Sequence, residues 1–260
     1  MSAPAVTLSH RPLRPALKEL IITEAKCAWR APVSLTLGVL VPIVLLVILG
    51  SVGALQKTIP GSNPPVTYMT TLIPVLIGMV LAMTALVSLP IVLVSQRESA
   101  FLRRLSTTPV APRWLLAAQV VVNFVLAGVA ILLIVAGGSL FFHVSAPAQL
   151  SGFILSALLA TTALFAIGLL IAAVAGNRVI AAVLGTILFY PLMFYAGLWV
   201  PRQSMSPTMR HISDYTPLGA GVHAMLSSIQ GSFPPTQPLL VMTAWAVVFG
   251  VASVKLFRWE

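Results

Sequence analysis

Three side chains in one polar segment, His211, Asp214 and His223, are of the types that bind metal ions or transfer protons. His211 and Asp214 are three positions apart, so on a helical turn they would face one another. A zinc site or an acid–base pair needs firmer spacing and a further ligand or nucleophile, for which His223 is the obvious candidate. We therefore expect an interfacial hydrogen bond between His211 and Asp214, with no catalytic residue, metal ligand or bound cofactor in this chain.

The elements that must position these residues are six long apolar stretches, and every charged side chain lies outside them. Roughly 20 apolar residues in a helix cross a hydrocarbon core of about 30 Å. The pattern therefore predicts an all-α membrane protein, one domain of residues 1–260 with a six-span bundle over residues 33–257. The stretches are Val33–Leu55, Tyr68–Val94, Trp114–Phe142, Ser151–Ala175, Val179–Val200 and Leu239–Val254.

The composition excludes several functions. Hydrophobic residues make up 58% of the chain and charged residues 8%, against roughly 25% charge in soluble domains. A net charge of +10 would suggest nucleic acid in a soluble protein, but here a lipid bilayer explains it better, and we expect no nucleic-acid partner. Proton- or ion-driven transporters keep ionisable groups at membrane depth, and the six stretches contain none. The energy for any transport would therefore come from elsewhere.

The distribution of the fifteen Lys and Arg residues predicts the orientation. If the chain has six spans, three of these basic residues lie in loops on one side of the membrane, namely Lys57, Arg202 and Arg210. The other twelve basic residues lie on the opposite side. Cytoplasmic segments collect Lys and Arg, so the richer side is cytoplasmic. We expect a multi-pass protein of the inner (plasma) membrane with both termini in the cytoplasm.

The N-terminal region divides into a flexible tail, residues 1–13, and an interfacial helix, residues 14–31. Pro15 suits the first turn of this helix, and Pro32 separates it from the first span. One narrow face is polar and the opposite face is mostly apolar, as in helices that lie in the membrane surface. The polar face consists of Glu19, Thr23, Lys26 and Arg30. The alternative is a simple extension of the first span.

The loop Ser95–Arg113 contains residues 97–106, which can form about three helical turns before Pro109 and Pro112 stop them. On this helix Glu98 lies in the middle of an apolar face made by Phe101, Leu102 and Leu105, while Arg103 and Arg104 point away. One interpretation is a surface helix whose Glu98 stabilises its own first turn through the helix dipole. The other is a short helix that inserts apolar side chains and a carboxylate into a cleft on another protein. The pattern does not decide between them.

The segment Pro201–Pro238 is longer than a connection between neighbouring helices requires. Thr216 can cap a helix that begins at Pro217 and continues to about Ile229. That helix would be only about 20 Å long, too short to cross the bilayer, so it would be re-entrant, buried against protein or flat on the outer surface.

Polar residues within the predicted spans are few. Gln119 and Asn123 share one face of the third span at i, i+4 spacing. Either they bond to a neighbouring helix, which we favour, or they face a translocation pathway.

The cytoplasmic loop resembles that of type-2 ATP-binding-cassette (ABC) exporter permeases, most of all the drug-efflux branch that includes daunorubicin-resistance permeases. The resemblance rests on Arg97-Glu98, Arg103-Arg104-Leu105 and Thr107-Thr108-Pro109, together with the six spans, the interfacial helix and the long last outer loop. It implies a coupling helix at residues 97–106 that docks on a separate cytoplasmic ATPase, present in two copies, which binds ATP and Mg. The coupling residues would be Arg97, Glu98, Phe101, Leu102, Arg103, Arg104 and Leu105.

The resemblance also implies a second permease, either an identical chain or a related one. Two short helices, Ser206–Ser213 and Pro217–Ile229, would close the pathway from outside, with Thr216, Pro217, Leu218 and His223 at this outer gate. His223 departs from the family, which often has an acidic or arginine-bearing pattern after the Pro-Leu pair.

The resulting hypothesis is a permease subunit of an exporter for an amphipathic drug-like or lipid-like substrate, which suggests a role in antibiotic resistance. The chain has no Gly-rich phosphate-binding loop followed by Lys, so it is not itself the ATPase. The alternatives are an ATP-independent secondary transporter or channel and an intramembrane enzyme.

Overall fold

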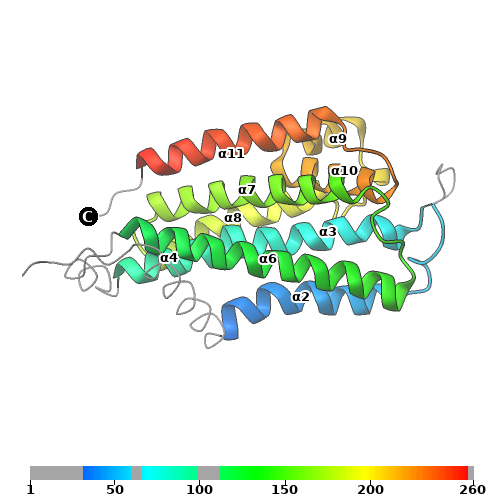
Figure 1. Ribbon diagram of the computed structural model, residues 1–260, viewed down its shortest axis with the longest axis horizontal. Coiled ribbons are helices and arrows are strands. Elements are labelled where there is room, and N and C mark those ends of the chain that lie inside the picture. The colour runs from blue at the N-terminus through cyan, green and yellow to red at the C-terminus, as the bar shows by residue number, and fades with distance from the viewer. Residues whose placement is uncertain (1–31, 60–65, 99–111, 257–260) are drawn as a thin grey trace, which may run out of the picture.

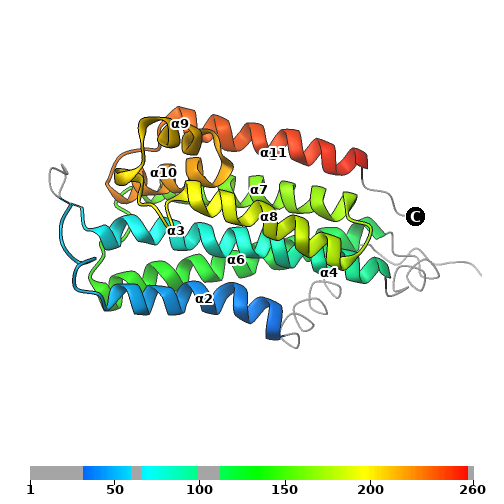
Figure 2. The ribbon, with the colours of Figure 1, turned by 180° about the vertical axis from the view of Figure 1, so that it is seen from behind.

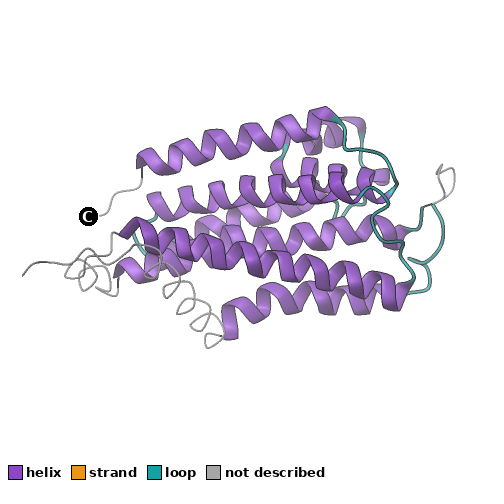
Figure 3. Ribbon diagram, in the orientation of Figure 1, coloured by secondary structure: helices purple, strands orange, loops and turns teal. Residues whose placement is uncertain are grey.

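The computed structural model describes residues 32–59, 66–98 and 112–256. The expected tail and interfacial helix, residues 1–31, and residues 99–111 of the predicted coupling helix lie outside this part of the chain. All regular elements of the described residues are helices, and they lie side by side in one elongated bundle (Figures 1 and 3). In chain order they are α2 (Pro32–Gly50), α3 (Tyr68–Ala82), the π-helix η1 (Met83–Ser88), α4 (Leu89–Glu98), α6 (Pro112–Phe142), α7 (Leu150–Val174), α8 (Arg178–Ala196), the 3₁₀-helix η2 (Arg202–Ser204), α9 (Pro207–Tyr215), α10 (Pro217–Ile229) and α11 (Thr236–Leu256).

Five helices of the described residues are long and apolar enough to cross a membrane. They are Tyr68–Glu98, Ala117–Phe142, Leu150–Val174, Arg178–Ala196 and Thr236–Leu256. These five confirm the predicted positions of the second to sixth spans, and the chain is a multi-pass membrane protein. Helix α2 has 19 residues, of which Leu40–Gly50 form a shorter apolar helix. The count of six spans therefore remains a prediction.

The largest differences from the sequence-based limits lie at three helix ends. Helix α2 ends at Gly50 instead of Leu55, where Gly50 and Gly53 lower the helix propensity of the segment. The second spanning helix continues to Glu98 instead of Val94, because nothing in its sequence stops it there. Helix α8 ends at Ala196, since Gly197 adopts a left-handed conformation with φ 99° and closes the last turn by donating to the carbonyls of Met193 and Phe194.

The two ends of the bundle carry different elements. The ends of α4 and α11 and the start of α8 lie at one end, which we name the Glu98 end, and α9 and α10 lie at the other, the α10 end (Figures 1 and 2). The second spanning helix, α3–η1–α4, is packed among α2, α6, α7, α8 and α10. Helices α6, α8 and α11 expose many large apolar side chains, as expected where lipid tails cover a protein.

The π-helix η1 lies directly before a proline, Pro90. Pro90 has no N–H, so the carbonyl of Leu86 loses its α-helical donor. One residue earlier, the N–H of Leu89 donates to the carbonyl of Thr84, five positions back, and the carbonyl of Ala85 loses its α-helical donor as well. Two adjacent buried carbonyls are therefore left outside the regular pattern of the helix.

Two glycines cover these carbonyls. A Cβ at Gly168 of α7 would overlap the carbonyl oxygen of Ala85, and a Cβ at Gly185 of α8 would overlap that of Leu86. The absence of a side chain therefore lets both helices approach the π-helix closely. Gly168 belongs to the small-residue pattern Gly168, Ala172 and Gly176, in which Ala172 is also buried.

We predict that Gly168→Ala and Gly185→Ala each destabilise the folded chain by about 1–3 kcal/mol, because the added methyl group meets backbone atoms that have no room to move. Thermal unfolding of the purified protein in detergent measures the effect. Gly128→Ala and Gly250→Ala are matched controls within helices, where a Cβ meets nothing within 4 Å. These controls should leave stability unchanged or raise it slightly, and an equal loss in all four variants would contradict the proposed packing.

Candidate functional site

At the Glu98 end, the carboxylate of Glu98 caps the N-terminus of α8. Its Oε1 accepts a hydrogen bond from the backbone N–H of Arg178 at 3.0 Å, and its Oε2 lies 3.8 Å from Nε of Arg178. The Asn177 side chain accepts from the N–H of Ile180 at 2.8 Å. Two acceptors thus satisfy N–H groups that the first turn of a helix leaves free, and the Glu98 charge also stabilises the positive end of the helix dipole.

The neighbouring residue, Arg97, binds the other side of the same turn. Its Nη1 donates to the carbonyl of Ala172 at 2.8 Å, in the last turn of α7. Arg97 and Glu98 therefore hold both helices that flank the turn Ala175–Asn177. Sequence reasoning selected Arg97 and Glu98, but it missed their partners on α7 and α8, about 80 positions away.

The interpretation in which Glu98 stabilises its own first helical turn does not describe the contact that the structure shows. Glu98 is the last described residue of α4, not the start of a separate helix, and its carboxylate stabilises the first turn of α8 instead. Phe101, Leu102, Arg103, Arg104 and Leu105 lie outside the described residues, so docking on another protein stays a prediction.

Gln119 and Asn123 are both buried on α6. The side-chain amide of Asn123 donates to the backbone carbonyl of Gln119 at 2.8 Å, within its own helix. The Oε1 of Gln119 is buried and has no hydrogen-bond partner among the described residues. Nearby, the rings of Phe124 and Phe165 join α6 to α7 with centroids 5.2 Å apart. Asn123 thus forms its hydrogen bond within its own helix. This bond does not decide between a contact with a neighbouring helix and a place in a translocation pathway.

At the α10 end, the two short helices form where the sequence placed them. Ser206 caps α9 by accepting from the N–H of Met209 at 3.3 Å. Thr216 caps α10 by accepting from the N–H of Gly219 at 3.1 Å, and its hydroxyl donates to the carbonyl of Ser213 at 2.8 Å. Pro217 and Leu218 are buried directly after this cap. The four predicted gate residues thus belong to one helix, and the structure places Thr216 at its start.

Helix α9 is tied to two spanning helices. The hydroxyl of Ser213 donates to the carbonyl of Tyr195 at the end of α8, at 2.6 Å. The indole N–H of Trp245 on α11 donates to the carbonyl of Tyr215 at 3.0 Å. The short helices therefore pack against the bundle and do not form a free loop.

Asp214 pairs with Arg202 and His223, and the expected bond between His211 and Asp214 is absent among the described residues. The Oδ1 of Asp214 lies 2.6 Å from Nη2 of Arg202 and 3.5 Å from Nδ1 of His223, although neither contact has the alignment of a hydrogen bond. His211 packs its ring on Tyr215 instead, with centroids 5.0 Å apart. Sequence reasoning missed Arg202 because η2 and the turn after it bring this residue back against α9.

His223 lies between opposite charges on a helix outside the five spanning segments. Burial lowers the pKa of His223 below its ordinary value of 6.5, the positive charge of Arg202 lowers it further, and the Asp214 carboxylate offsets part of this shift. The imidazole is therefore neutral at pH 7, and it contributes hydrogen-bonding capacity without a charge.

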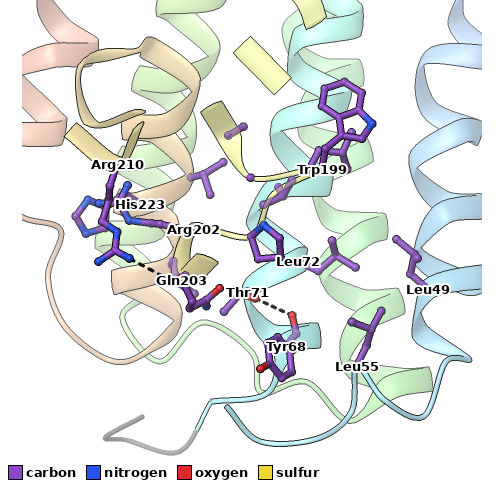
Figure 4. A pocket seen from close by; sticks show the side chains of 17 residues that line it. Leu49, Leu55, Tyr68, Thr71, Leu72, Trp199, Arg202, Gln203, Arg210 and His223 are labelled. Carbon is purple, nitrogen blue, oxygen red and sulfur yellow. Dashed lines mark hydrogen bonds between the residues drawn. The ribbon is translucent and has the colours of Figure 1, made fainter. Parts of the chain in front are cut away.

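A cavity of about 470 Å³ opens beside this cluster. Figure 4 shows Arg202, Gln203, Arg210 and His223 on one side of it and Leu49, Leu55, Leu72 and Trp199 on the other. The lining comes from α2, α3, the end of α8, η2, α9 and α10. The α10 end thus holds a pocket of ligand size with one polar and one apolar wall.

Comparison with protein families matches residues 15–229 to the family described as ABC-2 type transporter. The matched part ends with the last residue of α10 and includes both Glu98 and the Arg202–Asp214–His223 cluster. No curated protein matches the chain.

We predict that Glu98→Ala loosens the first turn of α8, because the N–H of Arg178 loses its acceptor. Loss of a capping acceptor typically costs about 1 kcal/mol. Hydrogen exchange followed by mass spectrometry should show faster exchange in a peptide covering the start of α8. Arg178→Ala is the matched control, since it keeps the backbone donor of the 3.0 Å hydrogen bond and should change exchange little. Equal exchange in both variants would contradict the capping role.

We predict that His223 makes stability depend on pH. Because its pKa is lower in the folded chain than in the unfolded chain, stability is complete above pH 6.5 and is lost as pH falls through the lowered value. Unfolding temperatures measured between pH 8 and pH 5 should fall less for His223→Gln than for the wild type. His211→Gln, which changes a histidine that forms no pair with Asp214, should keep the wild-type profile. Parallel profiles for His223→Gln and the wild type would refute this assignment.

Proposed function

Because this chain belongs to the ABC-2 type transporter family, we propose that it is the membrane permease of an ATP-driven exporter. The family match over residues 15–229 is the observation that carries this proposal. The five long apolar helices supply a membrane domain of the required kind. The energy for transport would come from a separate cytoplasmic ATPase, present in two copies. This ATPase would bind ATP and Mg and dock on the loop 95–113.

The contacts at the Glu98 end support coupling through this loop. Arg97 holds the last turn of α7 and Glu98 holds the first turn of α8, so the start of the loop is connected to both helices. A docked ATPase would move the loop residues 101–105. Arg97 and Glu98 at the end of α4 would transmit this movement to the bundle. Helices α7 and α8 would then shift together between two access states of the permease.

The positions of the charges support the proposed orientation. Arg97 near the end of α4, Arg178 at the start of α8 and Lys255 in the last turn of α11 belong to the Glu98 end. Arg202 of η2 and Arg210 of α9 belong to the α10 end, as does Lys57, whose carbonyl accepts from the N–H of Tyr68 at the start of α3. With α2 as the first of six spans, the Glu98 end would face the cytoplasm, together with both termini. The membrane would be the inner (plasma) membrane.

The remaining features of the proposal follow from the resemblance to drug-efflux permeases. A second permease, identical or related, would complete the pathway for an amphipathic drug-like or lipid-like substrate. Helices α9 and α10 would close this pathway from outside, with Thr216, Pro217, Leu218 and His223 at the gate. The attachment of α9 to α8 and α11 supports such a role, because movement of the spanning helices would move the gate.

We predict that Phe101→Ala lowers substrate-stimulated ATP hydrolysis about tenfold, a change of about 1.4 kcal/mol in coupling. The measurement uses the permease reconstituted with its ATPase, basal hydrolysis as reference, and a panel of cationic and anionic amphiphiles as substrates. Arg178→Ala is the control, because it changes the same end of the bundle and leaves the backbone bond to Glu98 in place.

Two outcomes would refute the proposal. Unchanged stimulation in Phe101→Ala, with the complex still copurifying, would exclude the loop as the coupling element. Substrate transport by the purified permease in vesicles, without nucleotide or an ATPase, would exclude the ATP-driven class.

A further inference from the structure

We propose that the cavity at the α10 end binds an amphiphile with an anionic headgroup, a phosphate or carboxylate carried on an apolar chain. The headgroup would lie against Arg210 and Gln203, and the chain would lie against Leu49, Leu72 and Trp199. The site belongs to the permease proposed above and its assignment as a substrate site rests on that function.

The two arginines of the cavity have different electrostatic partners. Arg202 is neutralised by Asp214, whose Oδ1 lies 2.6 Å away. Arg210 forms no ion pair with an acid of the described residues. Its Nη2 donates to the carbonyls of Gln203 at 3.3 Å and Met205 at 3.4 Å, which orients the guanidinium. Its Nε and Nη1 form none of the hydrogen bonds found among the described residues. The described residues that line the cavity include no acidic side chain, so the uncompensated charge that they supply is positive.

The other polar groups also favour an anion. Neutral His223 and the amide of Gln203 supply hydrogen-bond donors beside the guanidinium. A guanidinium with neighbouring neutral donors recognises carboxylate and phosphate oxygens through short, charge-assisted hydrogen bonds. A cationic headgroup would meet Arg210 without a carboxylate to offset the repulsion, so the cavity discriminates by the sign of the charge.

The opposite wall explains why the ligand is an amphiphile rather than a free anion. Leu49 comes from the end of α2, Leu72 from α3, and Trp199 follows α8, and Figure 4 shows these side chains across the cavity from Arg210. A volume of about 470 Å³ holds a headgroup and the first part of a chain. Trp199 is 51% exposed, as is usual for an indole at the level of lipid headgroups.

The test uses the full-length permease in nanodiscs of zwitterionic lipid, without an ATPase or nucleotide. Brominated dodecyl phosphate quenches tryptophan fluorescence on binding, and Trp199→Phe identifies the part of the signal that comes from the cavity. We expect Arg210→Gln to raise the Kd for this probe about tenfold, as for loss of one charge-assisted hydrogen bond. Arg210→Lys, which keeps the charge, should recover part of the affinity.

Lys57→Gln is the matched control, because it removes one exposed positive charge near the same end of the bundle without changing the cavity lining. We expect its Kd to stay within about twofold of the wild type, because Lys57 does not line the cavity. Equal losses in Arg210→Gln and Lys57→Gln would overturn the site, because the attraction would then be general. Equal or tighter quenching by brominated dodecyl trimethylammonium would overturn the anionic preference.

Inorganic phosphate distinguishes a free anion from an amphiphile. Failure of millimolar phosphate to displace the probe supports recognition of the whole amphiphile, and full displacement would overturn it. Since no ATPase is present, this binding result is independent of the coupling test. Binding without coupling would refute the exporter while leaving the site intact, and coupling without binding would refute the site alone.

Discussion

The packing of the bundle depends on two carbonyls that the second spanning helix cannot satisfy in the regular way. Pro90 and the π-type bond from Leu89 to Thr84 leave the carbonyls of Leu86 and Ala85 without α-helical donors. In a membrane interior no water is available to hydrate them. The glycines of α7 and α8 resolve this by bringing two helices against these oxygens, and this close approach holds α7 and α8 beside the centre of the second span.

This packing also determines what happens at the Glu98 end. Once α7 and α8 lie against η1, the turn between them lies beside the last turn of α4. Arg97 and Glu98 then reach the end of α7 and the start of α8. A carboxylate so placed has a local structural task, which does not require a partner protein, and it is also the last described residue before the predicted coupling segment. Both properties make Glu98 a connection between the loop and the bundle.

The sequence was sufficient to predict the elements whose signals are local. Thr216 and Pro217 define the start of α10 through a cap and a fixed φ, and long apolar runs define the five spanning helices. It was insufficient where distant residues decide the outcome. The Arg202–Asp214 pair depends on the fold of η2 and α9. Helical spacing alone would favour Arg210 as the partner of Asp214, because Arg210 lies four positions before it. The partners of Glu98 and Arg97 depend on the packing of three helices, and the π-helix depends on which neighbours can cover its free carbonyls.

The second spanning helix connects the two candidate sites. Tyr68, Leu72 and Val75 of α3 line the cavity, and Glu98 ends α4 on the same continuous helix. A rigid α-helix would transmit displacement along its whole length, but this one contains η1 between its halves. A π-type segment already has irregular hydrogen bonds, so a change of register there costs less than in the α-helical parts. The π-type segment, which Pro90 follows, therefore lies between the Glu98 end and the cavity, and the close contacts of Gly168 and Gly185 with Ala85 and Leu86 oppose a change of register there.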